Sequence, residues 1–470
     1  MTFTSTDFLL FSVLFFPVYF LTVHRLRLNN FLLLAANMIF YGWIHPYFVV
    51  LLLASTVVDF SLALLIDAEQ NQIRRRLLLA ASISVNLVFL GYFKYTNFVI
   101  SSFNDIVDSK FSLLNNIILP AGISFYTFQS MSYTIDVYKG HMRATRSLVD
   151  YLGFVSFFPH LVAGPIMRAT VLLPQIQRER RFDPAMVEDG ARQILWGLAK
   201  KILVADNLAV VVQVAFSSPA QYSALSLLIA SVFFSFQIYA DFSAYSDIAI
   251  GTAKIMGIRL IRNFDTPYFA VNIIEFWRRW HISLTTWFRD YVFFPMGGSR
   301  VSTRRWLFNI FFVFLISGLW HGANYTFLIW ALIHASTYIA VALGHRAGYR
   351  MPDGALSNIV SALVTFTFVT LAWVFFRAAN VETAVQILGR IADPHLWHFQ
   401  RSFWHATHAD NALAVTLLMV VAEWFTRRWE HPLAIAAWPP LARRTAYVSL
   451  LVAIILYGAS NEASFIYFQF

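Results

Sequence analysis

The uncharged stretch at residues 306–345 constrains the fold of this chain more than any other feature of its sequence. The stretch contains no Asp, Glu, Lys or Arg, and as a helix it is long enough to cross a bilayer about once or twice. The whole chain agrees, because 58% of its 470 residues are hydrophobic and only 13% are charged, whereas soluble domains average about 25% charged residues. The sequence therefore predicts an all-α, polytopic integral membrane protein.

Further apolar segments recur along the chain. They lie at residues 8–23, 31–41, 47–65, 77–92, 111–133, 148–162, 194–216, 225–242, 306–320, 325–343, 359–376, 412–424 and 446–457. Several are too short to cross a bilayer alone, since a crossing helix needs about 20 apolar residues. We therefore expect roughly 10 to 12 transmembrane helices, together with short re-entrant or interfacial helices. No internal repeat or linker divides the chain, so residues 1–470 are expected to form a single integral membrane domain.

Basic residues in the early loops predict the orientation of the chain. They follow the first, third and fifth apolar segments, as Arg25, Arg27, Arg74, Arg75, Arg76, Lys139, Arg143 and Arg146. Because Lys and Arg collect on the cytoplasmic side, the N-terminus is expected to lie outside the cytoplasm. The first segment follows no basic region and precedes no small-residue cleavage site, so we expect it to stay uncleaved.

Charge and cysteine content exclude several classes of function. The formal net charge is +10, but the basic residues form short clusters between apolar segments, which favours membrane lipid over nucleic acid as their partner. The chain has no Cys, so disulfides, thiolate metal sites and a cysteine nucleophile are excluded. Its histidines are scattered, and no metal is expected. For the His- and Trp-rich residues 393–410, an interfacial loop is favoured over a metal site, because the spacing matches no established one.

His321 is an ionisable residue within the uncharged stretch at residues 306–345. An ionisable group at that depth in a membrane usually has a function. Its neighbours Gly318, Trp320 and Gly322 would allow close approach by backbone or ligand and could hold the ring in one orientation. A catalytic histidine needs such surroundings. The alternative is a histidine that is hydrogen-bonded between packed helices.

Residues 259–305 are too polar for lipid and too aromatic for an ordinary loop. We expect short helices there, packed inside the protein or lining a water-filled cavity. Within this region, a helix over residues 275–291 would place Trp277, His281 and Leu284 on one face, with Arg278 and Arg289 directed elsewhere. Such a group could hold the phosphates of an acyl donor and orient its thioester. The alternative is an amphipathic interfacial helix whose basic residues contact lipid headgroups.

Two other polar groups lie beside apolar segments. Asp241 and Asp247 need partners if they are buried, and pairing with Arg278, Arg279 or Lys254 is expected to position the aromatic segment; acid/base catalysis is the less favoured alternative. The hydroxyl and amide side chains of residues 124–133 could line a polar path.

Four ordered elements resemble the membrane-bound O-acyltransferase (MBOAT) family. They are residues 239–247, 263–268, 276–284 and 318–322. Within that family the chain resembles the bacterial branch of the alginate O-acetyltransferase membrane subunit, cellulose-acetylating homologues and the D-alanyl transferase of teichoic acids, to which the closing residues 465–470 are also similar. The resemblance implies a fold of membrane helices around a central tunnel.

By this resemblance, His321 corresponds to the near-invariant catalytic histidine of the family and His281 to the second histidine of the bacterial branch. The fold would have to bring them together, since 40 positions separate them. His321 would act as general base on an acceptor hydroxyl. His281 or its neighbours would hold the donor or stabilise the oxyanion. The residues expected to bind the donor are Trp277, Arg278, Trp280, Arg289 and Trp320.

The function implied is transfer of acetyl from cytoplasmic acetyl-CoA, as substrate and not as a permanently bound cofactor, toward an exported polysaccharide such as alginate or cellulose. Relatives of this kind work with extracytoplasmic SGNH-like proteins, so such a partner within a polysaccharide-export complex of the bacterial inner membrane is expected. One alternative is D-alanyl transfer to teichoic acid from a carrier-protein thioester. The other is a non-enzymatic transporter or export channel, in which the polar residues define a substrate path.

Overall fold

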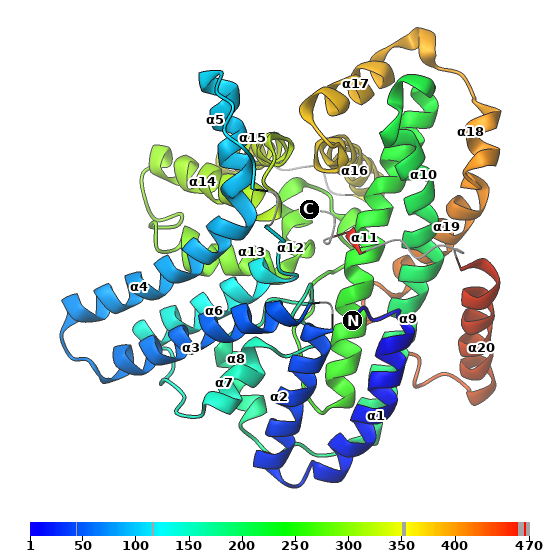
Figure 1. Ribbon diagram of the computed structural model, residues 1–470. Coiled ribbons are helices and arrows are strands. Elements are labelled where there is room, and N and C mark those ends of the chain that lie inside the picture. The colour runs from blue at the N-terminus through cyan, green and yellow to red at the C-terminus, as the bar shows by residue number, and fades with distance from the viewer. Residues whose placement is uncertain (44, 115–116, 350–353, 459–464, 467–470) are drawn as a thin grey trace. The chain divides into compact units, whose positions relative to one another are not determined.

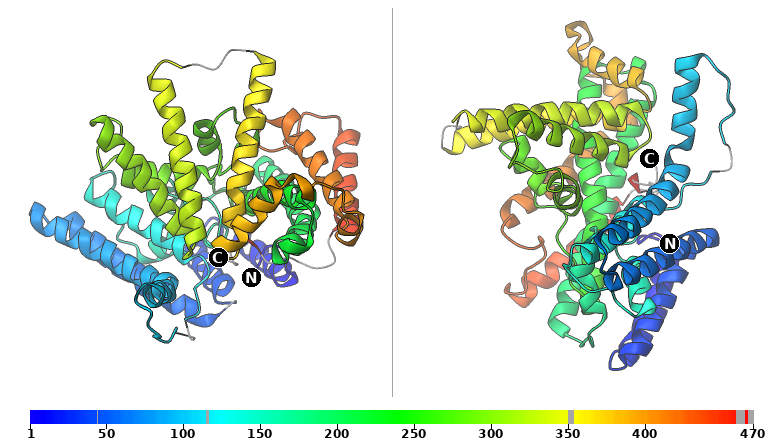
Figure 2. Two further views of the ribbon diagram at one scale, coloured as in Figure 1. Left: turned by 90° about the horizontal axis from the view of Figure 1, so that it is seen from above. Right: turned by 90° about the vertical axis from the view of Figure 1, so that its left-hand side faces the viewer.

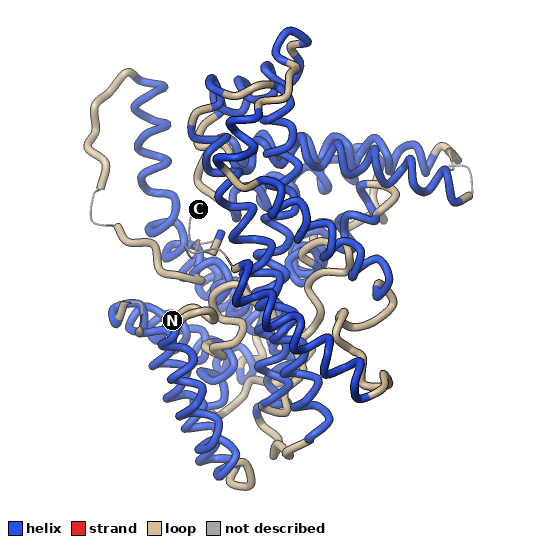
Figure 3. The backbone as a smooth tube through the Cα atoms, turned by 90° about the vertical axis from the view of Figure 1, so that its right-hand side faces the viewer, coloured by secondary structure: helices blue, strands red, loops and turns tan. Residues whose placement is uncertain are grey.

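A computed structural model describes residues 1–43, 45–114, 117–349, 354–458 and 465–466. Every regular element in these ranges is a helix (Figures 1 and 3), which confirms the all-α prediction. Residue contacts divide the chain into two compact units. The first consists of Met1–Ile194 and Ile248–Ile261, and the second of Leu195–Asp247 and Arg262–Phe470. The long helix α11 (Ala224–Ile255) contributes residues to both units.

The first unit is built from the N-terminal helices. They are α1 (Thr6–Thr22), α2 (Leu26–Gly42), α3 (Pro46–Ala68), α4 (Gln72–Leu90), the π-helical turn η1 (Gly91–Tyr95), α5 (Thr96–Val107), α6 (Ile123–Tyr138), α7 (Leu148–Val155), α8 (Ala169–Ile176) and most of α9 (Pro184–Ala199). Helix α3 packs against both α4 and α6. The direction of the chain changes between α4 and α5 (Figure 1), where η1 interrupts the α-helical hydrogen bonding, as π-bulges commonly do.

The polar residues of α6 are used within the first unit. Ser130 donates to the buried carboxylate of Asp59 on α3, which also accepts from Ser82 (2.6 Å) and Asn86 (2.7 Å) of α4. Gln129 donates to the carbonyl oxygen of Phe154 (3.2 Å). These bonds satisfy a buried carboxylate that would otherwise be costly inside a membrane protein. Ser130, one of the residues expected to line a polar path, thus links α6 to α3.

The second unit follows the π-helical turn η2 (Lys200–Ala205). Its remaining helices are α10 (Asp206–Ser217), η3 (Pro219–Gln221), α11, η4 (Pro267–Phe269), α12 (Ile273–Arg279), α13 (Ile282–Phe288), η5 (Arg289–Phe293), α14 (Thr303–His321), α15 (Tyr325–Arg346), α16 (Ala355–Arg377), α17 (Val381–Ala392), η6 (Pro394–Leu396), α18 (Arg401–Ala406), α19 (Ala409–Thr426) and α20 (Pro440–Tyr457). The run from η4 to η5 confirms the prediction of short helices in residues 259–305. In residues 393–410, η6 and α18 replace the expected loop.

Seven helices in the described part of the chain are long and apolar enough to cross a membrane. They are Pro46–Ala68, Gln72–Val107, Ala224–Ile255, Tyr325–Arg346, Ala355–Arg377, Ala409–Thr426 and Pro440–Tyr457. The expectation was roughly 10 to 12 crossings. The difference arises because some apolar segments form short or interrupted helices: residues 148–162 contain only the eight-residue helix α7, and residues 194–216 are divided among α9, η2 and α10.

Helices α14 and α15 pack against each other and run alongside each other (Figure 2). Gly318 of α14 makes this approach possible, since a Cβ atom there would lie 2.6 Å from the carbonyl oxygen of Phe327 and 2.7 Å from the Cβ of Ala331. Gly322 follows the end of α14, and a Cβ atom there would overlap the Phe327 ring. Both glycines therefore serve the packing of α15 against the segment that carries His321.

Candidate active site

His321 is the last residue of α14 and is only 5% exposed. Its ring is surrounded by aromatic side chains. The ring centroids lie 5.0 Å from Trp320, 5.2 Å from Trp330 of α15 and 5.2 Å from Phe376 of α16. Helices α15 and α16 thus enclose an imidazole that α14 presents at its end, and the aromatic walls restrict the orientation of the ring.

His281 lies between α12 and α13, and only 1% of its surface is exposed. Its backbone φ of 43° falls in the left-handed region, which few residues other than Gly, Asn, Asp and His adopt. The ring packs against Phe242 of α11 (4.6 Å), Phe264 (6.4 Å) and Trp320 (5.9 Å). Trp320 therefore contacts both His281 and His321. The fold brings the two predicted histidines to one indole ring.

The break at His281 corrects the prediction of a single helix over residues 275–291. Helix α12 ends at Arg279 and α13 starts at Ile282, so Trp277, His281 and Leu284 do not share a continuous helix face. The backbone N–H of Ile282 donates to the carbonyl oxygen of Asn263 (2.9 Å). This contact lies outside the segment itself, which explains why the local sequence pattern did not show the break.

Asn263 is a further residue of the site, and no role was assigned to it from the sequence. Its side chain contacts His281, with 3.2 Å between Oδ1 and the ring Nδ1 atom. The same oxygen accepts from the backbone N–H and the hydroxyl of Ser283, and the amide Nδ2 donates to Ser246 of α11 (3.2 Å). The element 263–268 did attract attention as one of the motifs of the resemblance, but only the fold shows which side chain it brings to His281.

The residues expected to bind the acyl donor fall into two groups. Trp277, Arg278 and Arg289 line a groove of about 470 Å³ between α12, α13, η5, α14 and α15. Trp280 lies elsewhere, packed against Trp373, Phe264 and other aromatic rings. Trp320 lies between the two histidines. The structure thus places three of the five residues at one groove.

The walls of this groove are mostly apolar, and its polar groups are few. Arg278 and Arg289 are exposed at its edge, and Arg289 also pairs with Asp290 (2.7 Å). Along α14 the lining extends from Trp306 to Ser317, about 16 Å at 1.5 Å per residue. Ser317 precedes His321 by one helical turn and shares its helix face. The groove therefore leads from the start of α14 toward the catalytic candidate.

The carboxylates of α11 have different partners from those expected. Lys200 pairs with Asp247 (2.6 Å), and Lys201 pairs with Asp241 (2.9 Å) and Asp206 (2.8 Å). Arg279 instead pairs with Glu275 on its own helix, and Lys254 with Asp189. The expected pairing was wrong because the lysines are supplied by η2, a π-helical turn about 40 positions upstream. The structural role of the two carboxylates remains, since they attach η2 to α11.

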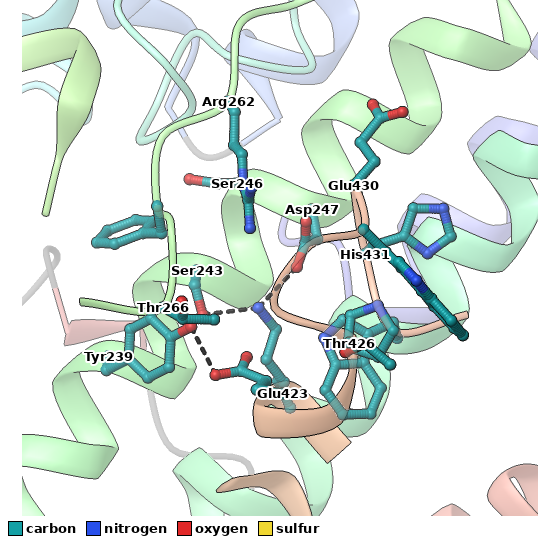
Figure 4. Close-up of a pocket in the computed structure, with 15 residues that line it drawn as sticks. Tyr239, Ser243, Ser246, Asp247, Arg262, Thr266, Glu423, Thr426, Glu430 and His431 are labelled. Carbon is teal, nitrogen blue, oxygen red and sulfur yellow. Dashed lines mark hydrogen bonds and ion pairs between the residues drawn. The ribbon is translucent and has the colours of Figure 1, made fainter. Parts of the chain in front are cut away.

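A small polar cavity of about 40 Å³ adjoins these ion pairs. Ser243, Asp247, Arg262 and Glu423 line it, and Glu423 accepts from the Tyr239 hydroxyl (2.8 Å) (Figure 4). Ser246 and Phe264 also line the cavity. Through Ser246 and Asn263, hydrogen bonds connect this cavity to His281. A cavity of this size has room for about one water molecule.

Burial controls the protonation of His281. The residue lies outside the candidate membrane spans, and burial lowers the pKa of its imidazole from 6.5 to about 3. Desolvation penalises the charged form of a histidine, so the pKa shifts downward. His281 is therefore neutral near pH 7, with one ring nitrogen that donates and one that accepts hydrogen bonds.

Comparison with known proteins agrees with this geometry. Residues 138–385 match the model of the MBOAT, membrane-bound O-acyltransferase family, a range that contains both histidines, Asn263 and the groove. A probable alginate O-acetylase AlgI of Pseudomonas aeruginosa is 41% identical over 82% of this chain and 73% of its own length. A peptidoglycan O-acetyltransferase of Helicobacter pylori is 34% identical over 93% and 91%.

A teichoic acid D-alanyltransferase of Bacillus subtilis is less similar, at 27% identity over 56% of this chain and 69% of its own length. All three relatives are named as transferases or acetylases. A multi-pass membrane chain with this family match is an enzyme, which removes the alternative of a non-enzymatic export channel. The chain belongs to the membrane-bound O-acyltransferase family.

Proposed function

We propose that this protein moves acetyl from cytoplasmic acetyl-CoA across the inner membrane for the O-acetylation of an exported polysaccharide. Two relatives that cover most of the chain are named for O-acetylation of alginate and of peptidoglycan. Alginate or cellulose is the proposed polymer, and an extracytoplasmic SGNH-like protein is the proposed partner for the final transfer. The observation that carries the proposal is the pair of buried histidines on Trp320, within the residues that match the family.

His321 is proposed as the general base. Its imidazole takes the proton of an acceptor hydroxyl while the hydroxyl oxygen forms a bond to the acyl carbonyl carbon. The carbon–sulfur bond then breaks, and the leaving thiolate of CoA takes the proton back from the imidazolium. The aromatic walls formed by Trp320, Trp330 and Phe376 exclude water, which limits hydrolysis of the thioester.

The groove along α14 is proposed to bind the acyl donor. Its apolar walls suit the pantetheine arm of CoA, and the guanidinium groups of Arg278 and Arg289 at its edge suit phosphate groups. Arg304, Arg305 and Arg346 lie near the end of the groove that Trp306 and Ala342 line. By the positive-inside rule this end faces the cytoplasm, where acetyl-CoA is made available to the enzyme.

The test is acetyl transfer by the purified protein in detergent, with the partner protein and an oligosaccharide added. The His321→Ala variant should lose transfer from acetyl-CoA by a factor of about 10² to 10⁴, since it lacks the general base. The matched control is His398→Ala, an exposed histidine in the segment after α17, which should keep wild-type activity. In cells, His321→Ala should abolish acetylation of the polymer while its synthesis continues. Full acetylation in that strain would contradict the proposal.

A second donor is tested in the same assay, because one relative is named as a teichoic acid D-alanyltransferase. Transfer from an alanyl-carrier thioester, with no transfer from acetyl-CoA, would favour D-alanylation over acetylation. Loss of either activity in His321→Ala would still assign the transfer to the same site.

A further inference from the structure

Asn263 is hydrogen-bonded to two helices of the second unit, α11 and α13. Its Oδ1 atom accepts from the backbone N–H (3.2 Å) and the hydroxyl (2.8 Å) of Ser283 in the first turn of α13. Its Nδ2 atom donates to the hydroxyl of Ser246 on α11 (3.2 Å). Its own backbone carbonyl oxygen accepts from Ile282. Asn263 is only 1% exposed, so water does not compete for these bonds.

The orientation of the Asn263 amide follows from its partners. The backbone N–H of Ser283 can only donate, so the amide atom that faces it must be the oxygen. A flipped amide would place an NH₂ group against this N–H, and two donors would meet in a buried site. The Ser246 hydroxyl can accept from Nδ2 in the observed orientation. The hydrogen-bond network therefore identifies the atom beside His281 as an oxygen.

That oxygen determines the tautomer of His281. Its neighbour is the ring Nδ1 atom, at 3.2 Å, and an amide oxygen can only accept. The hydrogen atom of a neutral His281 therefore belongs on Nδ1, and the lone pair belongs on Nε2. We propose that Asn263 is a positioning residue that fixes His281 in this tautomer, so that Nε2 acts as a hydrogen-bond acceptor toward the bound substrates during acyl transfer. This inference rests on the proposed function.

The tautomer determines which ring nitrogen of His281 can donate a hydrogen bond and which can accept one. An oxyanion is stabilised by donors, and a neutral His281 with its hydrogen on Nδ1 has no donor at Nε2. His281 is therefore not the oxyanion donor that the family resemblance allowed for it. Its acceptor atom suits an O–H or N–H of a substrate, such as the acceptor hydroxyl or an amide of the pantetheine arm.

Several charged groups on the elements that pack against His281 form ion pairs, whereas Arg278 of α12 is exposed. The ion pairs are Asp241 with Lys201, Asp247 with Lys200, Arg262 with Asp265, and Arg279 with Glu275. His321 is another titratable group near the ring, and both histidine rings contact Trp320. A carboxylate at position 263 would place a negative charge directly beside the Nδ1 atom of His281.

Asn263→Asp tests the proposal through the pH profile. A carboxylate still accepts from Nδ1 and from Ser283, but its charge favours the protonated form of His281. A protonated imidazole cannot accept a hydrogen bond at Nε2. We expect the acid limb of kcat/KM for acetyl transfer to move upward by about one pH unit or more, with activity recovering at higher pH. Asn263→Leu, which removes the acceptor, should lower activity by about 10- to 100-fold at every pH.

Ser246→Ala is the matched control. It removes the other bond of the same amide and leaves the oxygen beside Nδ1 in place, so its acid limb should match that of the wild type. A wild-type acid limb in Asn263→Asp, or wild-type activity in Asn263→Leu, would overturn the inference. If the wild-type protein itself transfers no acetyl, the proposed function has failed instead.

The tautomer can also be measured directly, without an Asn263 variant that must fold. In protein labelled with ¹⁵N-histidine, the signals missing from a His281→Asn sample identify the His281 ring nitrogens. A protonated Nδ1 and an unprotonated Nε2 are expected near pH 7. The opposite pattern would contradict the inference whether or not the enzyme is active.

Discussion

At the scale of single residues, the burial of His281 makes the stability of the folded protein depend on pH. The folded protein keeps this imidazole neutral with a pKa of about 3, whereas the unfolded chain protonates it near pH 6.5. The unfolded state thus binds more protons once the pH falls below about 6.5, and the folded state loses stability as the pH falls further toward 3. We expect thermal stability in detergent to decrease over this range. The decrease should be smaller in His281→Asn, and an equal decrease in both proteins would refute the assignment.

The sequence identified His321 and His281 because an ionisable residue is unusual in an apolar stretch and because their motifs resemble a known family. It could not assign a role to Asn263, since an asparagine between apolar spans has many structural uses. The role depends on three hydrogen bonds to residues 17 to 20 positions away. The partners of Asp241 and Asp247 could not be predicted either, because they also lie far away in the sequence.

At the scale of helices, the contact between α14 and α15 depends on Gly318. In Gly318→Ala, the new methyl group would lie 2.6 Å from a backbone oxygen that cannot move aside like a flexible side chain. We expect a destabilisation of about 1 to 3 kcal/mol and reduced acetyl transfer, because α14 carries His321. The control is Gly389→Ala in α17, where a Cβ atom has no neighbour within 4 Å. That change should be neutral or stabilising, and equal melting temperatures for the two variants would contradict the expectation.

The element types of the second unit could largely be predicted, but their boundaries could not. Residues 259–305 do form short helices, because their mixture of charges and aromatics suits neither lipid nor water. The break at His281 has no glycine or proline signal. Ile282 and Ser283 stabilise it by donating hydrogen bonds to Asn263, and Asn263 lies outside the local pattern that predicts helices.

At the scale of the whole molecule, the absence of cysteine allows the orientation of the chain to be measured. A single cysteine at Tyr349, just after the basic end of α15, should react with a membrane-impermeant maleimide only from the cytoplasmic side. A cysteine at Tyr325, at the other end of α15, should react only from the opposite side; both positions are exposed. Labelling from the reversed sides would place the Trp306 end of the groove outside the cytoplasm and would contradict the proposed entry of acetyl-CoA.

The left-handed backbone at His281 also affects which sequences can evolve at this position. In a library of all twenty amino acids selected only for folded protein, glycine and asparagine should be enriched, because they tolerate this conformation at the lowest cost. Selection for acetyl transfer should then retain histidine. Position 281 is thus constrained twice, once by the backbone conformation and once by catalysis. Valine and isoleucine should already be lost in the selection for folded protein.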